Sequence, residues 1–354
     1  ESNRIFFERL HSEGYLKGAI GDRNRELREE SWKRLERRTV GEKGRKIRLF
    51  VLRVAAMLAL PLLVVGIMWY MSEYGGADLP LANQEIKVGG SKAVVTLSTG
   101  EQLSLFGDTT VCVNDGLATL VNTKDTLNFM KGDHPVVGNS YNVIQIPRGG
   151  EYMLVLTDGT KVWVNADSRL KFPVRFKENS REVYLLSGEA YFQVERDESR
   201  PFLVHTSRGC VKVLGTEFNV RDYPEEYRVV TTLVNGSVQF TGKDKKKVVL
   251  KPGFQVIADS LTGVSDVREV NLREYVGWRS GLYVFSHLTL EELMRVVERN
   301  YDVTVFFANE ECKQLVFSGD LQKYETVEHF LRFIETGGDV RFVVKERTIT
   351  VYKK

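Results

Sequence analysis

The strongest feature of the hydrophobic pattern is an uninterrupted apolar run over residues 54–71. A helix rises about 1.5 Å per residue, so this run covers about 27 Å, close to the hydrocarbon thickness of a bilayer. A buried core helix is the alternative, but a core helix rarely lacks a polar face over its whole length. The pattern therefore predicts a transmembrane helix over residues 49–71.

Charged residues are distributed unevenly around this run. The formal net charge of +3 is a cancellation, because residues 1–48 contain 14 Lys and Arg against 9 Asp and Glu, and the remainder is slightly acidic. Basic residues cluster before the apolar run, and the first charges after it are acidic. The positive-inside rule then places the N-terminus in the cytoplasm and the bulk of the chain across the membrane.

The segment before the apolar run, residues 1–48, has a helical pattern with few apolar positions. Residues 24–38 are dense in Glu and Arg, with Leu27, Trp32 and Leu35 as the main apolar side chains. So short a piece buries little core by itself. Either its apolar residues pack into a partner, or it is a solvated helix whose basic end rests on anionic lipid. The spacing does not separate the two.

Short alternating strands dominate the middle of the chain, after a Gly- and Pro-containing linker over residues 72–84. From residue 85 to about 263, runs of four to six residues alternate between apolar and polar, and turn dipeptides such as Asp158-Gly159 and Ser187-Gly188 separate them. This pattern predicts an all-β sandwich, barrel or solenoid-like stack. We divide it into an N-terminal β extension, 85–142, and a main β domain, 143–265.

The pattern changes again after a predicted linker at residues 266–279. Thr289 and Glu292 form a capping-box sequence before a helix, and Thr326 precedes a second helix that Gly337 ends. Strands flank both helices, in the predicted order β-α-β-β-α-β-β. Residues 280–354 are therefore expected to form a small α+β domain.

Chemistry-bearing motifs are sparse. The five histidines are scattered without metal-ligand spacing, and we find no nucleophile elbow, phosphate loop or dinucleotide fingerprint. The sequence thus predicts no catalytic residue, no metal and no cofactor, and a protein that is not an enzyme. Cys112, Cys210 and Cys312 are isolated, which favours buried free thiols, although an oxidising compartment would permit one disulfide.

Several motifs in order resemble the FecR family of membrane-bound sigma-factor regulators. They are I-P-R-G-G-E-Y from residue 146, R-E-V-Y-L-L-S-G-E-A-Y-F-Q-V from 181, V-L-G-T-E-F-N-V from 213 and L-V-N-G-S-V from 233. The later motifs F-S-H-L-T-L-E-E-L and E-R-N-Y-D-V resemble the C-terminal module of Bacteroidetes-type members, which is similar to the short N-terminal signalling (STN) fold of secretins and TonB-dependent receptors.

The resemblance implies a fold class and a location. The fold class is a single-pass membrane protein with a cytoplasmic α-helical segment, one transmembrane helix, a periplasmic all-β FecR domain and a small STN-like α+β domain. The location is the inner membrane, with a cytoplasmic N-terminus and a periplasmic C-terminus.

The resemblance also implies a set of partners. Residues 1–48 would bind a cytoplasmic extracytoplasmic-function (ECF) sigma factor, and the periplasmic part would bind the signalling domain of an outer-membrane TonB-dependent (SusC-like) transducer. The signal would pass by staged cleavage by site-specific proteases, with no direct contact to nucleic acid.

One pair of residues is a candidate for covalent chemistry. Some family members cleave themselves at a Gly-Thr in the V-L-G-T motif, which corresponds to Gly215-Thr216. A strained bond would let the threonine hydroxyl attack the preceding carbonyl in an N-to-O acyl shift, followed by hydrolysis. The alternative is an ordinary tight turn before the next strand.

The resemblance and the strand pattern also indicate candidate partner contacts. Trp32 and Leu35 match the family's Trp-containing stretch before the membrane and are the candidate sigma-factor contacts. Pro61 and Gly66 would weaken the membrane helix for an intramembrane protease, although both residues are simply commoner in such helices. For the transducer we expect an exposed strand edge at Leu315 and Phe317 or at Ile349 and Val351.

Two other functions are compatible with parts of this pattern. One is an inner-membrane-anchored periplasmic structural or assembly protein with no sigma-factor role. The other is a membrane-tethered hydrolase, which would need a concave cluster of carboxylates or nucleophiles that the spacing does not show. The sequence also leaves open whether the sensed ligand is an iron chelate or a glycan, and whether the protein only inhibits its sigma factor or also activates it.

Overall fold

The computed structural model describes residues 86–354, except 88, 107–110, 115–117, 124, 133–139, 260–262 and 323–325. The contacts divide the chain into two compact units, Glu1–Ala82 and Asn83–Lys354, and every described residue belongs to the second. The predicted regions 1–48, 49–71 and 72–84 therefore lie outside the described residues.

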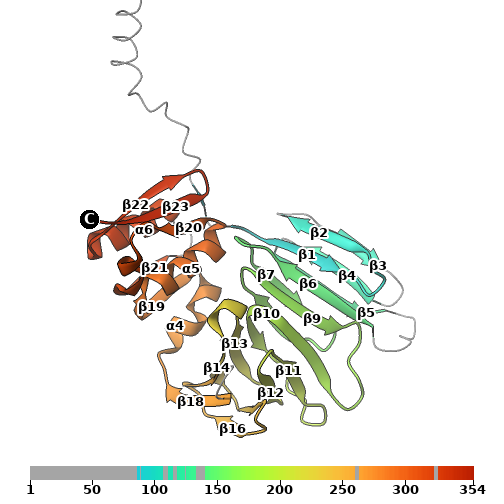
Figure 1. Ribbon diagram of the computed structural model, residues 1–354. Helices are drawn as coiled ribbons and strands as arrows, with labels where there is room; N and C mark the ends of the chain where they lie inside the picture. The colour runs from blue at the N-terminus through green and yellow to red at the C-terminus, as the bar shows by residue number, and fades with distance from the viewer. Residues whose placement is uncertain are drawn as a thin grey trace, which may run out of the picture. The chain divides into compact units, whose positions relative to one another are not determined.

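The expected fold class, a single-pass membrane protein with one transmembrane helix, is corrected for the part of the chain that the structure describes, which is mostly β-sheet with few helices. These helices are short: α4 Leu272–Val276, α5 Leu290–Tyr301 and α6 Val327–Gly337. Among the described residues, none of the helices has the length and apolar character needed to cross a membrane. The described part of the chain is instead mostly β-sheet (Figure 1).

Strands β1 to β18 form two sheets that share strand β10, and together they make up what we call the β domain. The first sheet has the order β2-β1-β6-β9-β10-β11-β12-β15-β16. Its strands are β1 Lys92–Thr96, β2 Gln102–Phe106, β6 Tyr141–Ile146, β9 Ser168–Pro173, β10 Arg181–Gln193, β11 Phe202–His205, β12 Gly209–Val213, β15 Val238–Gly242 and β16 Lys247–Leu250.

The second sheet has the order β3-β4-β5-β7-β8-β10-β13-β14-β17-β18. Its other strands are β3 Val111–Asn114, β4 Ala118–Thr123, β5 Thr126–Lys131, β7 Tyr152–Val155, β8 Lys161–Val164, β13 Glu217–Asp222, β14 Arg228–Asn235, β17 Phe254–Asp259 and β18 Gly263–Glu269. Most pairs are antiparallel, but β10–β11 and β5–β7 are parallel.

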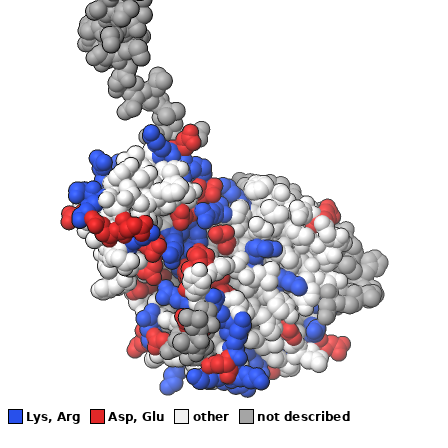
Figure 2. All heavy atoms as spheres, in the orientation of Figure 1, with Lys and Arg blue, Asp and Glu red and all other residues white. Residues whose placement is uncertain are grey.

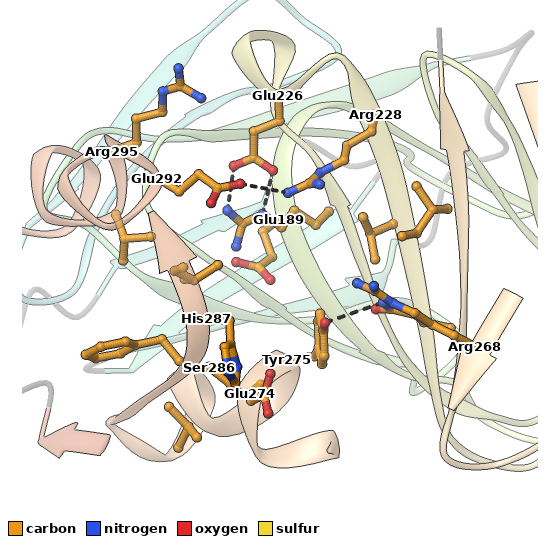
Figure 3. A pocket seen from close by; sticks show the side chains of 18 residues that line it. Glu189, Glu226, Arg228, Arg268, Glu274, Tyr275, Ser286, His287, Glu292 and Arg295 are labelled. Carbon is orange, nitrogen blue, oxygen red and sulfur yellow. Dashed lines mark hydrogen bonds and ion pairs between the residues drawn. The ribbon is translucent and has the colours of Figure 1, made fainter. Parts of the chain in front are cut away.

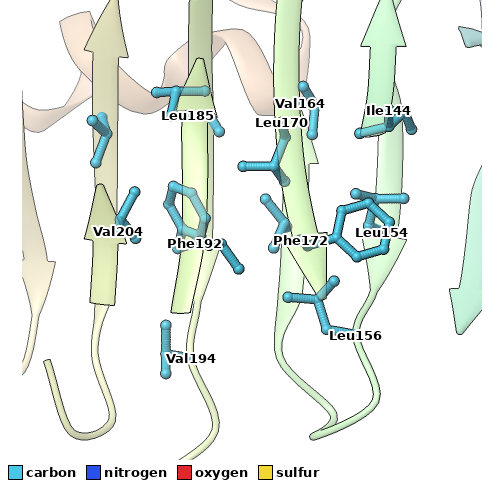
Figure 4. Close-up of a cluster of buried hydrophobic side chains, with 14 of the residues drawn as sticks. Ile144, Leu154, Leu156, Val164, Leu170, Phe172, Leu185, Phe192, Val194 and Val204 are labelled. Carbon is cyan, nitrogen blue, oxygen red and sulfur yellow. The ribbon is translucent and has the colours of Figure 1, made fainter. Parts of the chain in front are cut away.

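The core of the β domain lies between these two sheets. Ile144 and Leu170 come from the first sheet and Leu154 and Val164 from the second, and all four are completely buried in one cluster (Figure 4). Alternation along each strand produces this arrangement, because every second side chain points to the same face.

Strand β10 bends from one sheet into the other at Gly188. Its first half pairs with β9 and β11 and its second half with β8 and β13. The register with β9 shifts between Leu185 and Ser187, and Gly188 has a φ of 99°, in the region that favours glycine. The predicted turn at Ser187-Gly188 is therefore wrong, because the two short strands are one bent strand.

Residues 266–279, which the sequence pattern predicts as a linker, have regular structure. The end of β18 pairs with β17, then α4 follows, and a 3₁₀ helix, η2, spans Gly277–Ser280. The side chain of Asn271 accepts a hydrogen bond from the amide of Arg273 and so caps α4.

The C-terminal module, residues 282–353, combines two small sheets with two α-helices in its described residues. Its elements in chain order are β19 Leu282–Thr289, α5, β20 Thr304–Phe307, the 3₁₀ helix η3 Glu310–Gln314, β21 Val316–Gln322, α6, β22 Val340–Lys345 and β23 Thr348–Lys353. The strands form a pair, β19–β21, and a sheet of order β20-β23-β22. The predicted capping box is confirmed, since Thr289 and Glu292 exchange hydrogen bonds at 3.1 and 3.2 Å at the start of α5.

Candidate functional site

A charged cavity of about 480 Å³ lies where the β domain meets the C-terminal module (Figure 3). Strands β13, β14, β17 and β18 and the 3₁₀ helix η1, Pro224–Glu226, line one side, and β19, α4 and α5 line the other. Figure 2 shows acidic and basic side chains gathered along this boundary. We call this boundary the junction.

Arg299 of α5 is the central anchor of the junction. Its side chain is only 4% exposed, although it is charged. Nη1 donates to Glu225 Oε1 at 2.7 Å, and Nη2 lies 3.3 Å from Glu226 Oε1. The guanidinium carbon is 3.9 Å from the ring centroid of Tyr223, whose hydroxyl donates to the carbonyl of Ala166. Arg299 thus attaches helix α5 to the β domain through charge, hydrogen bonds and a ring face.

Glu226 is held ionised at this junction. Burial acts to raise the pKa of Glu226, but the charge of Arg221, its hydrogen bonds and the charge of Arg299 together hold that pKa below its ordinary value. Because the folded pKa is lowered, the stabilisation is present at neutral pH and is lost as pH falls through the folded pKa. The junction is therefore expected to weaken on acidification.

Glu189 lies at the floor of the cavity and is 5% exposed. Its carboxylate accepts hydrogen bonds from the side-chain amides of Asn165 and Asn219, each at 2.9 Å. The carbonyl oxygen of Asn219 in turn accepts from the indole of Trp278 at 3.4 Å. Glu189 is thus the acceptor of a polar network that connects β10, β13 and the turn after β8 to the segment leading into the C-terminal module.

Most charged side chains that line the cavity form ion pairs with other side chains of the protein. Arg221 pairs with Glu226, Arg228 lies 3.5 Å from Glu292, and Arg295 lies 3.3 Å from Glu291. Among the described residues, no group of His, Cys, Asp and Glu is arranged to hold a metal ion. The arrangement suits holding two parts of the protein together.

Gly215 and Thr216 lie on a different face of the β domain, beside an open cavity of about 630 Å³. Thr216 is 6% exposed; its hydroxyl donates to the carbonyl of Ser237 at 3.0 Å, and its carbonyl accepts from the amide of Val194. A Cβ on Gly215 would lie 2.7 Å from the Cα of Arg196. The Gly215–Thr216 peptide bond therefore lies close to two other segments, around residues 194–196 and Ser237. Self-cleavage at this bond stays a prediction.

The predicted strand edge at Ile349 and Val351 is wrong. Strand β23 is the central strand of its sheet, parallel to β20 on one side and antiparallel to β22 on the other, so no edge remains for a partner strand. Both side chains are completely buried.

Leu315 and Phe317 are placed differently. Leu315 directly precedes β21 and Phe317 lies within it, and among the described strands β21 pairs only with β19. Phe317 is 8% exposed and packs in the core with Leu315 beside it, so a partner would meet the backbone edge there.

In each outer strand of the three-stranded sheet, a backbone amide donates a hydrogen bond to a glutamate side chain. Glu298 of α5 accepts from the amide of Val305 in β20 at 2.9 Å, and Glu335 of α6 accepts from the amide of Phe342 in β22 at 2.6 Å. Such acidic groups at sheet edges disfavour pairing with another chain. The remaining predicted contacts, Trp32 and Leu35, and the helix-weakening residues Pro61 and Gly66 lie outside the described residues.

Sequence reasoning missed the residues of the junction. The partners Arg299 and Glu225 are 74 positions apart, and a charged residue on an amphipathic helix is ordinarily solvated. The pattern offered one weak signal, which is that Glu225 and Glu226 follow Pro224 directly in a break between strands.

Comparison with known proteins gives two family matches and related solved structures. A family model described as "FecR protein" matches residues 142–239, and one described as "FecR, C-terminal" matches residues 282–351. Two crystal structures, at 1.65 and 2.50 Å resolution, of a protein from Parabacteroides distasonis ATCC 8503 described as a "putative anti-sigma factor" are similar. Each is 27% identical, with a TM-score of 0.56 over 60% of this chain and 99% of that chain. No curated protein matches the sequence.

Proposed function

This chain belongs to the FecR family, and we propose that it is an anti-sigma regulator that binds a cytoplasmic sigma factor and changes its availability. The observation that carries the proposal is the succession of a FecR domain and a FecR C-terminal domain, in a fold shared with a protein described as an anti-sigma factor. The junction supports it physically, because a regulator needs parts that are held together and can be separated.

The finer proposal is a relay between compartments. The protein lies in the inner membrane, with residues 1–48 in the cytoplasm and its C-terminus in the periplasm. The support is the reversal of charge around the apolar run at residues 54–71. A periplasmic signalling domain of an outer-membrane TonB-dependent transducer contacts the C-terminal module, and site-specific proteases then release the sigma factor. The edge of β21 supports this contact, since it is a described strand edge that has no partner strand.

Sigma-factor binding is tested by co-purification of the full chain with a candidate ECF sigma factor. We expect the full chain to retain the sigma factor and a chain lacking residues 1–48 to lose it. Trp32→Ala is expected to weaken binding about tenfold or more, as is typical for truncation of an aromatic anchor. An unrelated sigma factor is the control. Failure of the full chain to retain any candidate sigma factor would instead favour the structural or assembly role.

Self-cleavage at Gly215-Thr216 has its own test. In the proposed step Thr216 Oγ1 attacks the Gly215 carbonyl carbon, the C–N bond breaks to give an ester and a free amine, and water then hydrolyses the ester. Wild-type protein and Thr216→Ser, which keeps the hydroxyl, should give two fragments, and Thr216→Ala should give one. N-terminal sequencing should find Thr216 at the start of the second fragment. A single intact band from folded wild-type protein would refute self-cleavage and leave the tight turn.

A further inference from the structure

The segment that precedes β1 packs into the C-terminal module, almost two hundred positions away in sequence. We call residues 86–91 the strap; the structure describes all of them except residue 88. Ile86 is 6% exposed and belongs to the hydrophobic core of the C-terminal module. In the chain, the strap follows residues 1–85 and precedes the β domain.

The strap completes the N-terminus of helix α6. The first amides of a helix have no partner within the helix, and a side chain at the N-cap ordinarily accepts from one of them. Thr326 occupies that position but makes no such cap hydrogen bond. Instead, the amide of Val327 donates to the carbonyl of Ile86 at 3.0 Å. Removal of the strap would leave this buried residue of the module without that partner.

The strap also lies against the C-terminal end of helix α5. Two carbonyls there accept from outside the module, Arg299 from the amide of Gly149 at 2.7 Å and Asn300 from the amide of Gly89 at 3.5 Å. Gly149 belongs to the β domain, and Gly89 belongs to the strap. Both hydrogen bonds are accepted by helix α5, and the Arg299 side chain of the same helix anchors the junction.

Backbone packing holds the strap against the β domain as well. A Cβ placed on Gly89 would overlap the carbonyl oxygen of Gly149 and lie 2.6 Å from its Cα, so only glycine fits. Two residues later, Ser91 forms a parallel bridge with Glu151. The strap therefore contacts backbone atoms of the β domain on one side and the ends of α5 and α6 on the other, while Lys87 and Gly90 stay exposed.

We propose that the C-terminal module and the strap are coupled, so that the strap keeps its contacts only while the module stays docked on the β domain through Arg299. A partner that displaces the module frees the backbone of the strap, which precedes the β domain in the chain, for cleavage or for pulling. By the reciprocity of coupled sites, displacement of the strap loosens the module equally. The inference rests on the described contacts and does not depend on sigma-factor binding.

The first test perturbs the strap and reads the module. Amide hydrogen exchange of the full chain is measured by mass spectrometry for Gly89→Ala and for Gly90→Ala. The second variant is a matched control, because a Cβ on Gly90 meets no atom within 4 Å. We expect Gly89→Ala to raise exchange about tenfold or more in peptides that cover the start of α6 and residues 147–151, and Gly90→Ala to change neither. Unchanged protection at the start of α6 in Gly89→Ala would overturn the coupling.

The second test perturbs the junction and reads the strap. Arg299→Gln removes the anchor, and Arg295→Gln is the control on the same helix, since its partner Glu291 also lies on α5. We expect Arg299→Gln alone to raise exchange and protease cleavage at residues 86–91 while the strands around Phe192 stay protected. If Gly89→Ala fails to fold, the Arg299→Gln experiment still tests the coupling. A strap that stays protected in folded Arg299→Gln protein contradicts the proposal.

Discussion

Replacing Arg181 with methionine is expected to destabilise the β domain by about 3–5 kcal/mol, the range for removal of one partner of a buried ion pair. The side chain of Arg181 is 1% exposed, and its Nη1 lies 2.9 Å from Asp158 Oδ2. The guanidinium also donates to the carbonyls of Glu195 and Arg200 at 2.8 and 2.9 Å. Methionine fills the space but leaves a buried carboxylate and two carbonyls without their donor.

Urea denaturation of the full chain, followed by circular dichroism, measures this loss. Arg196→Met is the control, because Arg196 is 80% exposed and its pair with Glu198 is solvated, so its loss should stay within about 0.5 kcal/mol. Adding Asp158→Asn to Arg181→Met should recover part of the loss, because the stranded charge is then removed. Equal stability of the Arg181→Met and Arg196→Met proteins would contradict the assigned role.

Local sequence signals were sufficient to predict a helix or strand wherever one face of that element is buried. The alternation expected in the middle of the chain is found in β8, where Val162 and Val164 are buried and Lys161 is exposed. The capping box at Thr289 could be predicted for a similar reason, since both partners lie within one helical turn. Alternation and capping depend on neighbours in sequence, and sequence shows those neighbours directly.

Asp158 shows where a local prediction is correct but incomplete. The sequence predicts a turn at Asp158-Gly159, and the structure confirms it, because Asp158 Oδ1 accepts from the amide of Thr160 at 3.0 Å. The other carboxylate oxygen meets Arg181, 23 positions away. The same residue closes a turn and neutralises a buried charge, and only the first role leaves a pattern within a few residues.

The junction and the sheet order could not be predicted because they depend on pairing between distant segments. The turn at Glu346-Arg347 predicts the hairpin of β22 with β23, but nothing near β23 in sequence indicates that β20 occupies its other edge. Hydrophobic alternation is the same for a central and an edge strand of such a sheet. Likewise, Arg299 follows a helical pattern whose exposed positions are also charged. Burial of its guanidinium is decided by the β domain, which contributes Tyr223, Glu225 and Glu226.

Substitution of Gly188 by alanine is expected to cost about 3 kcal/mol of β-domain stability. Two effects add: a φ of 99° is unfavourable for residues with a Cβ, by about 1–2 kcal/mol, and the new methyl group has no room, which adds about 1–3 kcal/mol. The added Cβ would lie 2.5 Å from the Cα of Ser168, so the backbone of β9 must shift. That shift would disturb the point where β10 passes from one sheet to the other.

Gly253→Ala separates the two effects in the same urea experiment. Gly253 has a φ of 85°, but a Cβ there meets no atom within 4 Å, so only the conformational cost of about 1 kcal/mol should remain. Ser168→Ala combined with Gly188→Ala should not restore stability, because it removes Oγ and leaves the clash with the backbone of residue 168 in place. Equal losses for Gly188→Ala and Gly253→Ala would show that β10 accommodates the methyl group, and that the bend does not depend on its close approach to β9.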